Sequence, residues 1–258
     1  MSKDYKSNIY YLIRRGWHDQ LSVFCDGVTQ RKGKDPVAMF WRAYGLGMDG
    51  AFPQCVSQLE QFSSRKDMQY PVTLALMYFH RRSPQGDREV VDTLRSELSI
   101  AEDVTKDAGM ILAARFCLFT GDLDNAQRIA ARVLGRLKRG SEIFAQDLPD
   151  LNPQTPAEIE ACVIFLWVVF ARGPSGSSPS EYRRQLAPVD NFLRLVGEQY
   201  PDGDMHMLWA QTKIRLGLHS DALNAYNQCI AACPHFAPAL TEKALLLAGM
   251  NDWEQCLD

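Results

Sequence analysis

The stretch that most constrains the fold is residues 203–234, GDMHMLWAQTKIRLGLHSDALNAYNQCIAACP, which reads as one complete helix-turn-helix unit. Gly217 can adopt the positive φ angle that ends a first helix, and Pro234 stops a second. Trp209 and Tyr226 have the size to fill the space between this helix pair and the next. Three small residues stand where two antiparallel helices would touch: Ala210, Ala222 and Cys229.

The same unit recurs along the chain. Gly16 and Gly50 are 34 residues apart, and Gly121 stands in a turn with the same pattern of small and apolar neighbours as Gly217. A period of 34 residues is typical of the tetratricopeptide (TPR) repeat. We therefore expect an all-α, right-handed α-solenoid of TPR helix-turn-helix repeats over residues 1–258, with six repeats, a truncated seventh and no sheet.

Two insertions interrupt the spacing around the fifth repeat, at residues 140–155 and 173–180. The second of these, GPSGSSPS, has the composition of a flexible linker. The helices of this repeat are expected at residues 156–171 and near residues 182–199. Because Pro188 lies inside the later helix, we expect that helix either to start late or to kink.

The chain ends inside its seventh unit, as an unfinished apolar helix pair. A stacked array needs a polar cap, so we expect an N-terminal fragment of a longer solenoid. Leu247 and Trp253 would then belong to an interface that the rest of the seventh repeat buries.

The first helices of TPR repeats line the concave surface where partners usually bind. In repeats two, four and six, that face would carry mainly apolar and aromatic side chains. This candidate partner-binding groove comprises Phe40, Tyr44, Met48, Ile111, Arg115, Phe119, Met207, Gln211 and Arg215. Such a lining suits a helix or a neighbouring subunit, although the alternative is that some of these side chains are simply core. The Lys and Asn clamp with which chaperone-binding TPR domains hold a carboxylate is missing.

Other kinds of site find little support in the sequence. Cys229 and Cys233, with His206 and His235 nearby, have one loose spacing where zinc sites have two tight ones, so core packing is the preferred interpretation. No nucleophile set, phosphate loop or carboxylate pair stands out, and we expect no catalytic residues, cofactor, metal or small-molecule substrate. The net charge of -3 argues against nucleic acid. The longest apolar run, residues 161–171, is about half a membrane span, so no direct membrane insertion is expected.

Two strings carry a sharper resemblance. Residues 35–50, DPVAMFWRAYGLGMDG, and residues 74–89, LALMYFHRRSPQGDRE, resemble the N-terminal repeats of the tetratricopeptide repeat protein 21 family. That family supplies the large TPR subunit of intraflagellar transport complex A. The NDW of residues 251–253 also fits, and the resemblance covers the whole chain in register. It is strong over residues 35–89 and weak over residues 140–201, where the insertions depart from the family.

The resemblance implies a non-catalytic protein–protein interaction scaffold that supports retrograde ciliary transport and the ciliary entry of membrane cargo. It implies protein partners, namely other complex A subunits, and a location in the cytoplasm, the cilium or flagellum and its basal body. The alternative is a TPR adaptor of another kind, such as a chaperone-binding module, which the missing clamp counts against. An enzyme is a third class that no residue set supports.

Overall fold

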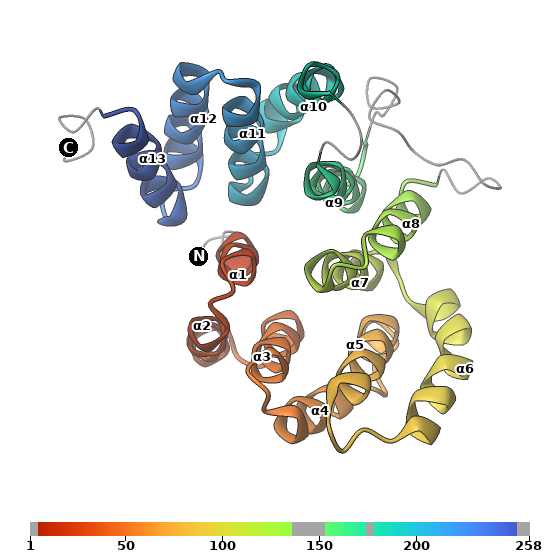
Figure 1. Cartoon of the computed structure of the whole chain (residues 1–258). Helices are drawn as coiled ribbons and strands as arrows, with labels where there is room; N and C mark the ends of the chain where they lie inside the picture. Colours follow the sequence, from red (N-terminus) through yellow and green to blue (C-terminus); the bar gives the residue numbers. More distant parts are fainter. Residues whose placement is uncertain (1–4, 136–152, 174–177, 252–258) are drawn as a thin grey trace. The chain divides into compact units, whose positions relative to one another are not determined.

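The computed structural model describes residues 5–135, 153–173 and 178–251. All regular secondary structure in these residues is helical, which confirms the expected all-α repeat solenoid (Figure 1). The described helices are α1 (Tyr5–Arg14), α2 (His18–Lys32), α3 (Pro36–Met48), α4 (Phe52–Glu60), α5 (Gln69–Arg82), α6 (Arg88–Val104), α7 (Asp107–Thr120), α8 (Leu123–Val133), α9 (Pro156–Arg172), α10 (Pro179–Gln199), α11 (Gly203–Leu216), α12 (His219–Ala232) and α13 (Pro238–Gly249).

Several helices begin where a side chain caps the first turn. Asp35 precedes α3, and its Oδ1 accepts hydrogen bonds from the backbone N–H of Val37 at 2.9 Å and of Ala38 at 3.1 Å. Before α9, Thr155 Oγ1 accepts from the N–H of Glu158 at 3.2 Å, and Glu158 Oε2 accepts from the N–H of Thr155 at 3.0 Å, a reciprocal capping box. These bonds join residues at most three positions apart, so the local sequence sets where the helices start.

The turns inside the repeats depend on glycine. Gly121 ends α7 with φ 82° and Gly217 ends α11 with φ 80°, both left-handed conformations that a Cβ atom disfavours. The N–H of Gly217 bonds to the carbonyl oxygen of Ile214 at 2.9 Å, which closes the last turn of the helix. The positive φ predicted at Gly217 is therefore confirmed.

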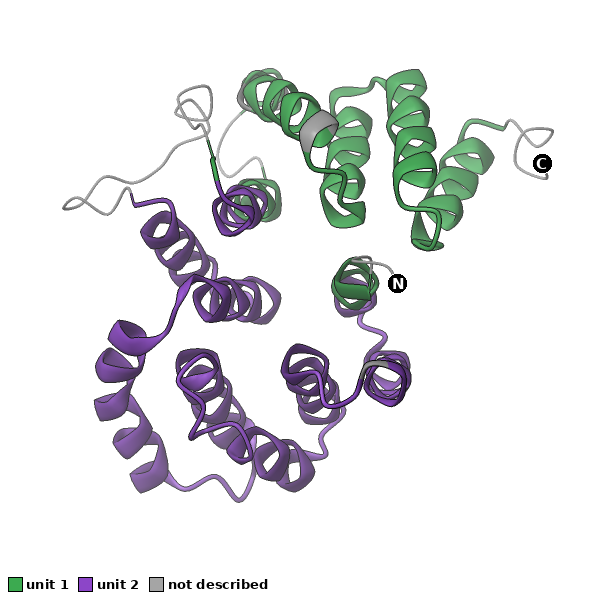
Figure 2. Ribbon diagram, turned by 180° about the vertical axis from the view of Figure 1, so that it is seen from behind, with its two compact units in different colours: residues 1–11, 142–154, 166–258 green, residues 12–141, 155–165 purple. Residues whose placement is uncertain are grey.

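The chain forms two compact units (Figure 2). Unit 1 comprises residues 1–11, 142–154 and 166–258, and unit 2 comprises residues 12–141 and 155–165. The single array expected over residues 1–258 stays a prediction.

Helices that follow one another in the sequence pack together within each unit. In unit 2, α3 packs against α4, α5 against α6, and α7 against α8; in unit 1, α11 packs against α12, and α12 against α13. Ala126 in α8, with Ala222 and Cys229 in α12, is completely buried, as the repeat pattern predicts for small residues between helices.

The helix bounds correct one detail of the sequence interpretation. Helix α10 begins at Pro179 and contains Pro188, so the predicted late start is wrong, whereas the kink given as the alternative stays a prediction. Its start is fixed by Ser178, whose side chain accepts a hydrogen bond from the N–H of Glu181, and by proline at a first-turn position. Helix α6 runs from Arg88 to Val104, and Asp87 caps its first turn by accepting a hydrogen bond from the N–H of Glu89.

Some predictions fall outside the described residues. Most of the insertion at residues 140–155, the middle of the insertion at residues 173–180, and Trp253 lie there. Leu247 in α13 is already buried in unit 1, and the apolar side chains of this helix that stay exposed are Leu240 and Leu245. No helix within the described ranges has the length and apolar character needed to cross a membrane.

Candidate partner-binding surfaces

The six candidate groove residues of unit 2 lie on α3 and α7, and four of them are core. Phe40 and Tyr44 on α3 are 0% and 2% exposed, and Ile111 and Arg115 on α7 are 5% and 2% exposed. Met48 and Phe119, near the C-terminal ends of the same two helices, are partly exposed.

Aromatic rings explain this burial. Tyr44 meets Phe79 and Phe116 edge to face, with ring centroids 6.2 Å and 6.0 Å apart, and Phe40 meets Phe116 at 6.0 Å. Edge-to-face pairs at such distances are favourable beyond the area that they bury. The Tyr44 hydroxyl also donates to the carbonyl oxygen of Phe119 at 3.4 Å, and burial raises the pKa of Tyr44 above its ordinary value. The first helices of repeats two, three and four thus fill the space between them with their own rings.

The three candidate groove residues of unit 1 lie on α11. Met207 is completely buried, Gln211 is partly exposed and Arg215 is exposed. The guanidinium of Arg215 lies 3.4 Å from the ring centroid of Phe170, donates to the Phe170 carbonyl oxygen at 2.8 Å and bonds to the hydroxyl of Tyr182. Arg215 therefore ties α11 to α9 and α10 while keeping an exposed surface.

Five of the nine candidate groove residues are thus packed inside their own units. A partner could reach them only by opening the core, which costs several kcal/mol for side chains of this size. The residues that a partner can touch directly are Met48, Phe119, Gln211 and Arg215. Binding at these four stays a prediction.

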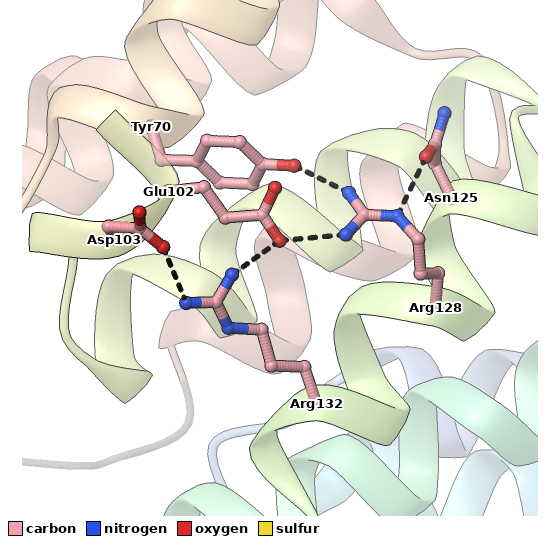
Figure 3. A network of polar contacts seen from close by, with 6 residues as sticks. All are labelled: Tyr70, Glu102, Asp103, Asn125, Arg128 and Arg132. Carbon is pink, nitrogen blue, oxygen red and sulfur yellow. Dashed lines mark hydrogen bonds and ion pairs between the residues drawn. The ribbon is translucent and has the colours of Figure 1, made fainter. Parts of the chain in front are cut away.

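A polar network that the sequence analysis missed joins α5, α6 and α8 (Figure 3). Glu102 Oε1 accepts from Arg128 Nη1 at 2.7 Å and pairs with Arg132 Nη1 at 2.7 Å. Arg128 also donates to the hydroxyl of Tyr70 at 2.8 Å, and Arg132 to Asp103 at 3.3 Å. Asn125 completes the network by accepting from Arg128 Nε at 3.2 Å.

This network links α8 to α5 and α6 through hydrogen bonds and ion pairs. Burial tends to raise the pKa of Glu102, but the hydrogen bonds and positive charges of Arg128 and Arg132 outweigh it and hold the pKa below its usual value. The only signal in the sequence was the spacing of Arg128 and Arg132, which puts both on one face of a helix. Nothing in that spacing named Glu102, 26 residues earlier, as the partner.

Of the four residues weighed as metal ligands, Cys229, Cys233 and His206 lie in packing positions, whereas His235 is exposed. Cys229 and Cys233 are buried, and Cys229 Sγ lies 3.9 Å from the carbonyl oxygen of Gly203. His206 Nδ1 lies 2.9 Å from the carbonyl oxygen of Asp202. Within the described part of the chain, no three His, Cys, Asp or Glu side chains are grouped closely enough to hold a metal ion.

Comparison with known proteins gives a family match along almost the whole chain. The family model described as "Tetratricopeptide repeat protein 21 N-terminal ARM repeat" matches residues 9–257. Tetratricopeptide repeat protein 21B from Homo sapiens is 28% identical over 255 residues, which cover 96% of this chain and 17% of that protein. Tetratricopeptide repeat protein 21A from Homo sapiens is 25% identical over 97% of this chain, and the 21 homolog from Caenorhabditis elegans is 24% identical over 98%.

The chain spans about a sixth of the length of these curated relatives, because each alignment covers 17% of the relative. The matched family model describes their N-terminal repeats, and it follows the described helices from α1 to α13. With this match and the repeat architecture together, the chain belongs to the tetratricopeptide repeat protein 21 family, in the N-terminal repeat region of that family.

Proposed function

We propose that this chain is a non-catalytic protein–protein interaction scaffold of intraflagellar transport complex A. It would support retrograde ciliary transport and the ciliary entry of membrane cargo, acting in the cytoplasm, the cilium and its basal body. Its partners would be other subunits of that complex, with no nucleic acid, inserted membrane segment or small-molecule substrate. The observation that carries this proposal is the match of residues 9–257 to the N-terminal repeats of the family.

The packing of the chain supports a scaffold role. The cysteines of the described residues are buried, and burial raises the pKa of the Cys25, Cys55 and Cys117 thiols to about 12. Thiols with so high a pKa are poor nucleophiles at neutral pH. The Glu102 carboxylate likewise forms ion pairs with Arg128 and Arg132.

The test is affinity purification of the tagged full-length protein from ciliated cells, followed by mass spectrometry. Recovery of other complex A subunits is the expected result. Recovery of cytosolic chaperones without any ciliary transport protein would replace the proposal with the chaperone-adaptor alternative. The same purification from non-ciliated cells gives the background.

Two point variants locate the contact. Met48→Asp places a charge at a partly exposed groove position of α3, and Val23→Asp places the same charge on α2, where the side chain is 73% exposed. Loss of the complex A subunits with Met48→Asp alone would assign the contact to the groove. Loss with Val23→Asp alone would assign it to the surface of α2.

A further inference from the structure

The first two turns of α1 contact residues near the other end of the chain, all within unit 1. Ser7 Oγ donates to Asp202 Oδ2 at 3.3 Å, across 195 sequence positions. Tyr11 Oη donates to Glu242 Oε1 at 3.0 Å, across 231 positions. In a linear repeat array each repeat contacts only its neighbours, so these bonds depart from the pattern.

This helix depends on its surroundings. Helix α1 has 10 residues, and isolated helices shorter than about 12 to 15 residues are marginal in water. Within it, Ser7 and Ile9 are 0% exposed and Tyr11 is 6% exposed. Residues 5–11 are therefore expected to be helical only while they are docked.

The surface that receives α1 is pre-formed by other contacts of unit 1. Asp202 caps α11: its Oδ1 accepts from the N–H of Asp204 at 2.9 Å and of Met205 at 3.1 Å. The cap holds the carboxylate in place, and the second oxygen, Oδ2, takes the hydroxyl of Ser7. One side chain thus both starts α11 and binds α1.

The apolar part of this surface is the ring of Phe236, which is 1% exposed. On one side, a Cβ atom added at Gly203 would stand 2.8 Å from the ring, so only glycine lets α11 begin this close. On another side, the ring of Tyr11 meets Phe236 edge to face, with centroids 6.4 Å apart and planes at 88°. We call Asp202, Phe236 and Glu242 together the docking surface.

We propose that the docking surface is a helix-binding site and that residues 5–11 are its displaceable intramolecular ligand. Its two carboxylates offer only acceptors, so they bind a helix that brings hydrogen-bond donors one turn apart, as the hydroxyls of Ser7 and Tyr11 are. Phe236 selects an aromatic ring at the second of these positions. An amphipathic partner helix with a hydroxyl residue and, four positions later, a tyrosine meets the same demands.

Docking in cis would control access to this surface. A partner helix must compete with a ligand that is covalently attached, so its apparent affinity is the intrinsic affinity multiplied by the fraction of chains in which α1 is undocked. Release of α1 would also melt it, which makes the pair an order–disorder switch. This inference goes beyond the scaffold role, because it names one surface and the segment that covers it.

The first test uses the intact chain carrying Ser7→Ala and Tyr11→Phe, which keeps both side chains close to their size and removes both donors. Hydrogen exchange at residues 5–14 should become at least about tenfold faster, since two bonds to charged acceptors are lost. Tyr200→Phe, which removes an exposed hydroxyl from the same unit, is the control and should leave exchange unchanged. Equal exchange in all three chains would overturn the proposal.

The second test measures binding in trans with a fluorescent peptide of residues 5–14, YKSNIYYLIR. The peptide should bind the double variant at least about tenfold more tightly than the wild-type chain, in which α1 occupies the surface. A peptide with the same two substitutions should bind neither. Equal binding of the YKSNIYYLIR peptide to both chains, or no binding to the variant, would show that the docking surface is not covered by α1 in this way.

A third measurement stays valid if the double variant folds poorly. A photoreactive benzoyl-phenylalanine at position 11 of the otherwise wild-type chain should cross-link on irradiation to residues 236–242 of the same chain. Excess peptide should reduce this product. Cross-links formed only between two chains would identify a second copy as the occupant and overturn docking in cis.

Discussion

Tyr44 on α3 and Phe116 on α7 meet edge to face inside unit 2, with ring centroids 6.0 Å apart and ring planes at 88°. Seventy-two positions separate them in the sequence, and the second repeat thus packs directly on the fourth. Because of this contact, Tyr44, which the sequence analysis placed in the partner-binding groove, is part of the core.

Replacing Tyr44 should therefore affect folding before it affects binding. Tyr44→Ala removes a buried ring and should lower the free energy of unfolding by about 3 to 5 kcal/mol, whereas Tyr44→Phe keeps the ring and should cost about 1 kcal/mol or less. Urea unfolding followed by circular dichroism measures both. An alanine variant as stable as the wild type would mean that the ring cluster does not form. Aspartate at Phe40 or Tyr44 should unfold unit 2, so these positions cannot report on assembly alone.

The tight helix contacts of the repeats should reject large side chains. Ala126→Trp in α8 and Ala222→Trp in α12 should each lower the free energy of unfolding by about 1 to 3 kcal/mol or more, because both sites are completely buried. Ala231→Trp, at an exposed position of α12, is the matched control and should change stability by less than about 0.5 kcal/mol. If Ala126→Trp and Ala222→Trp both melted like the wild type, these two positions would not lie where neighbouring helices touch.

The Glu102 network should contribute stability that is lost in acid. The pKa of the Glu102 carboxyl in the folded chain lies below its ordinary value of 4.5, so the contribution is present above about pH 4.5 and disappears as pH falls through the folded pKa. Glu102→Gln should cost about 1 to 2 kcal/mol at pH 7, and the difference from wild type should shrink below pH 4.5. Denaturant unfolding at several pH values checks this, with the exposed Glu89→Gln on the same helix as control. If the difference in the free energy of unfolding between wild type and Glu102→Gln stayed constant with pH, the charge of Glu102 would not be the cause of the stabilisation.

Burial of His206 should lower the free energy of unfolding as pH falls from neutral to mildly acidic values, above the range in which the Glu102 contribution is lost. Burial lowers its pKa below the ordinary 6.5, so the unfolded chain takes up a proton before the folded chain does. Stability should then decrease as pH falls below 6.5 towards the folded pKa. In His206→Gln this part of the pH dependence should vanish, whereas it should persist in His235→Gln, at an exposed loop position. Thermal unfolding at pH 8, 6.5 and 5.5 decides between these outcomes.

The sequence by itself determined the repeat and its local geometry. Gly217 in the turn, Asp35 before α3 and the small residues Ala222 and Cys229 act over a few positions, through φ preference, capping and the size of a side chain. Such effects depend on near neighbours, so they can be read before any fold is known. The family resemblance at residues 35–50 and 74–89 rested on the same local strings.

Tertiary structure decided which surfaces are covered. A helical period shows that Phe40 and Tyr44 share an apolar face, but the rings that bury them come from other repeats. The partners of Arg128 and Ser7 also lie on other parts of the chain, with Glu102 26 positions away on α6 and Asp202 195 positions away. Burial and charge pairing depend on what lies across a contact, and only the folded chain brings those residues together.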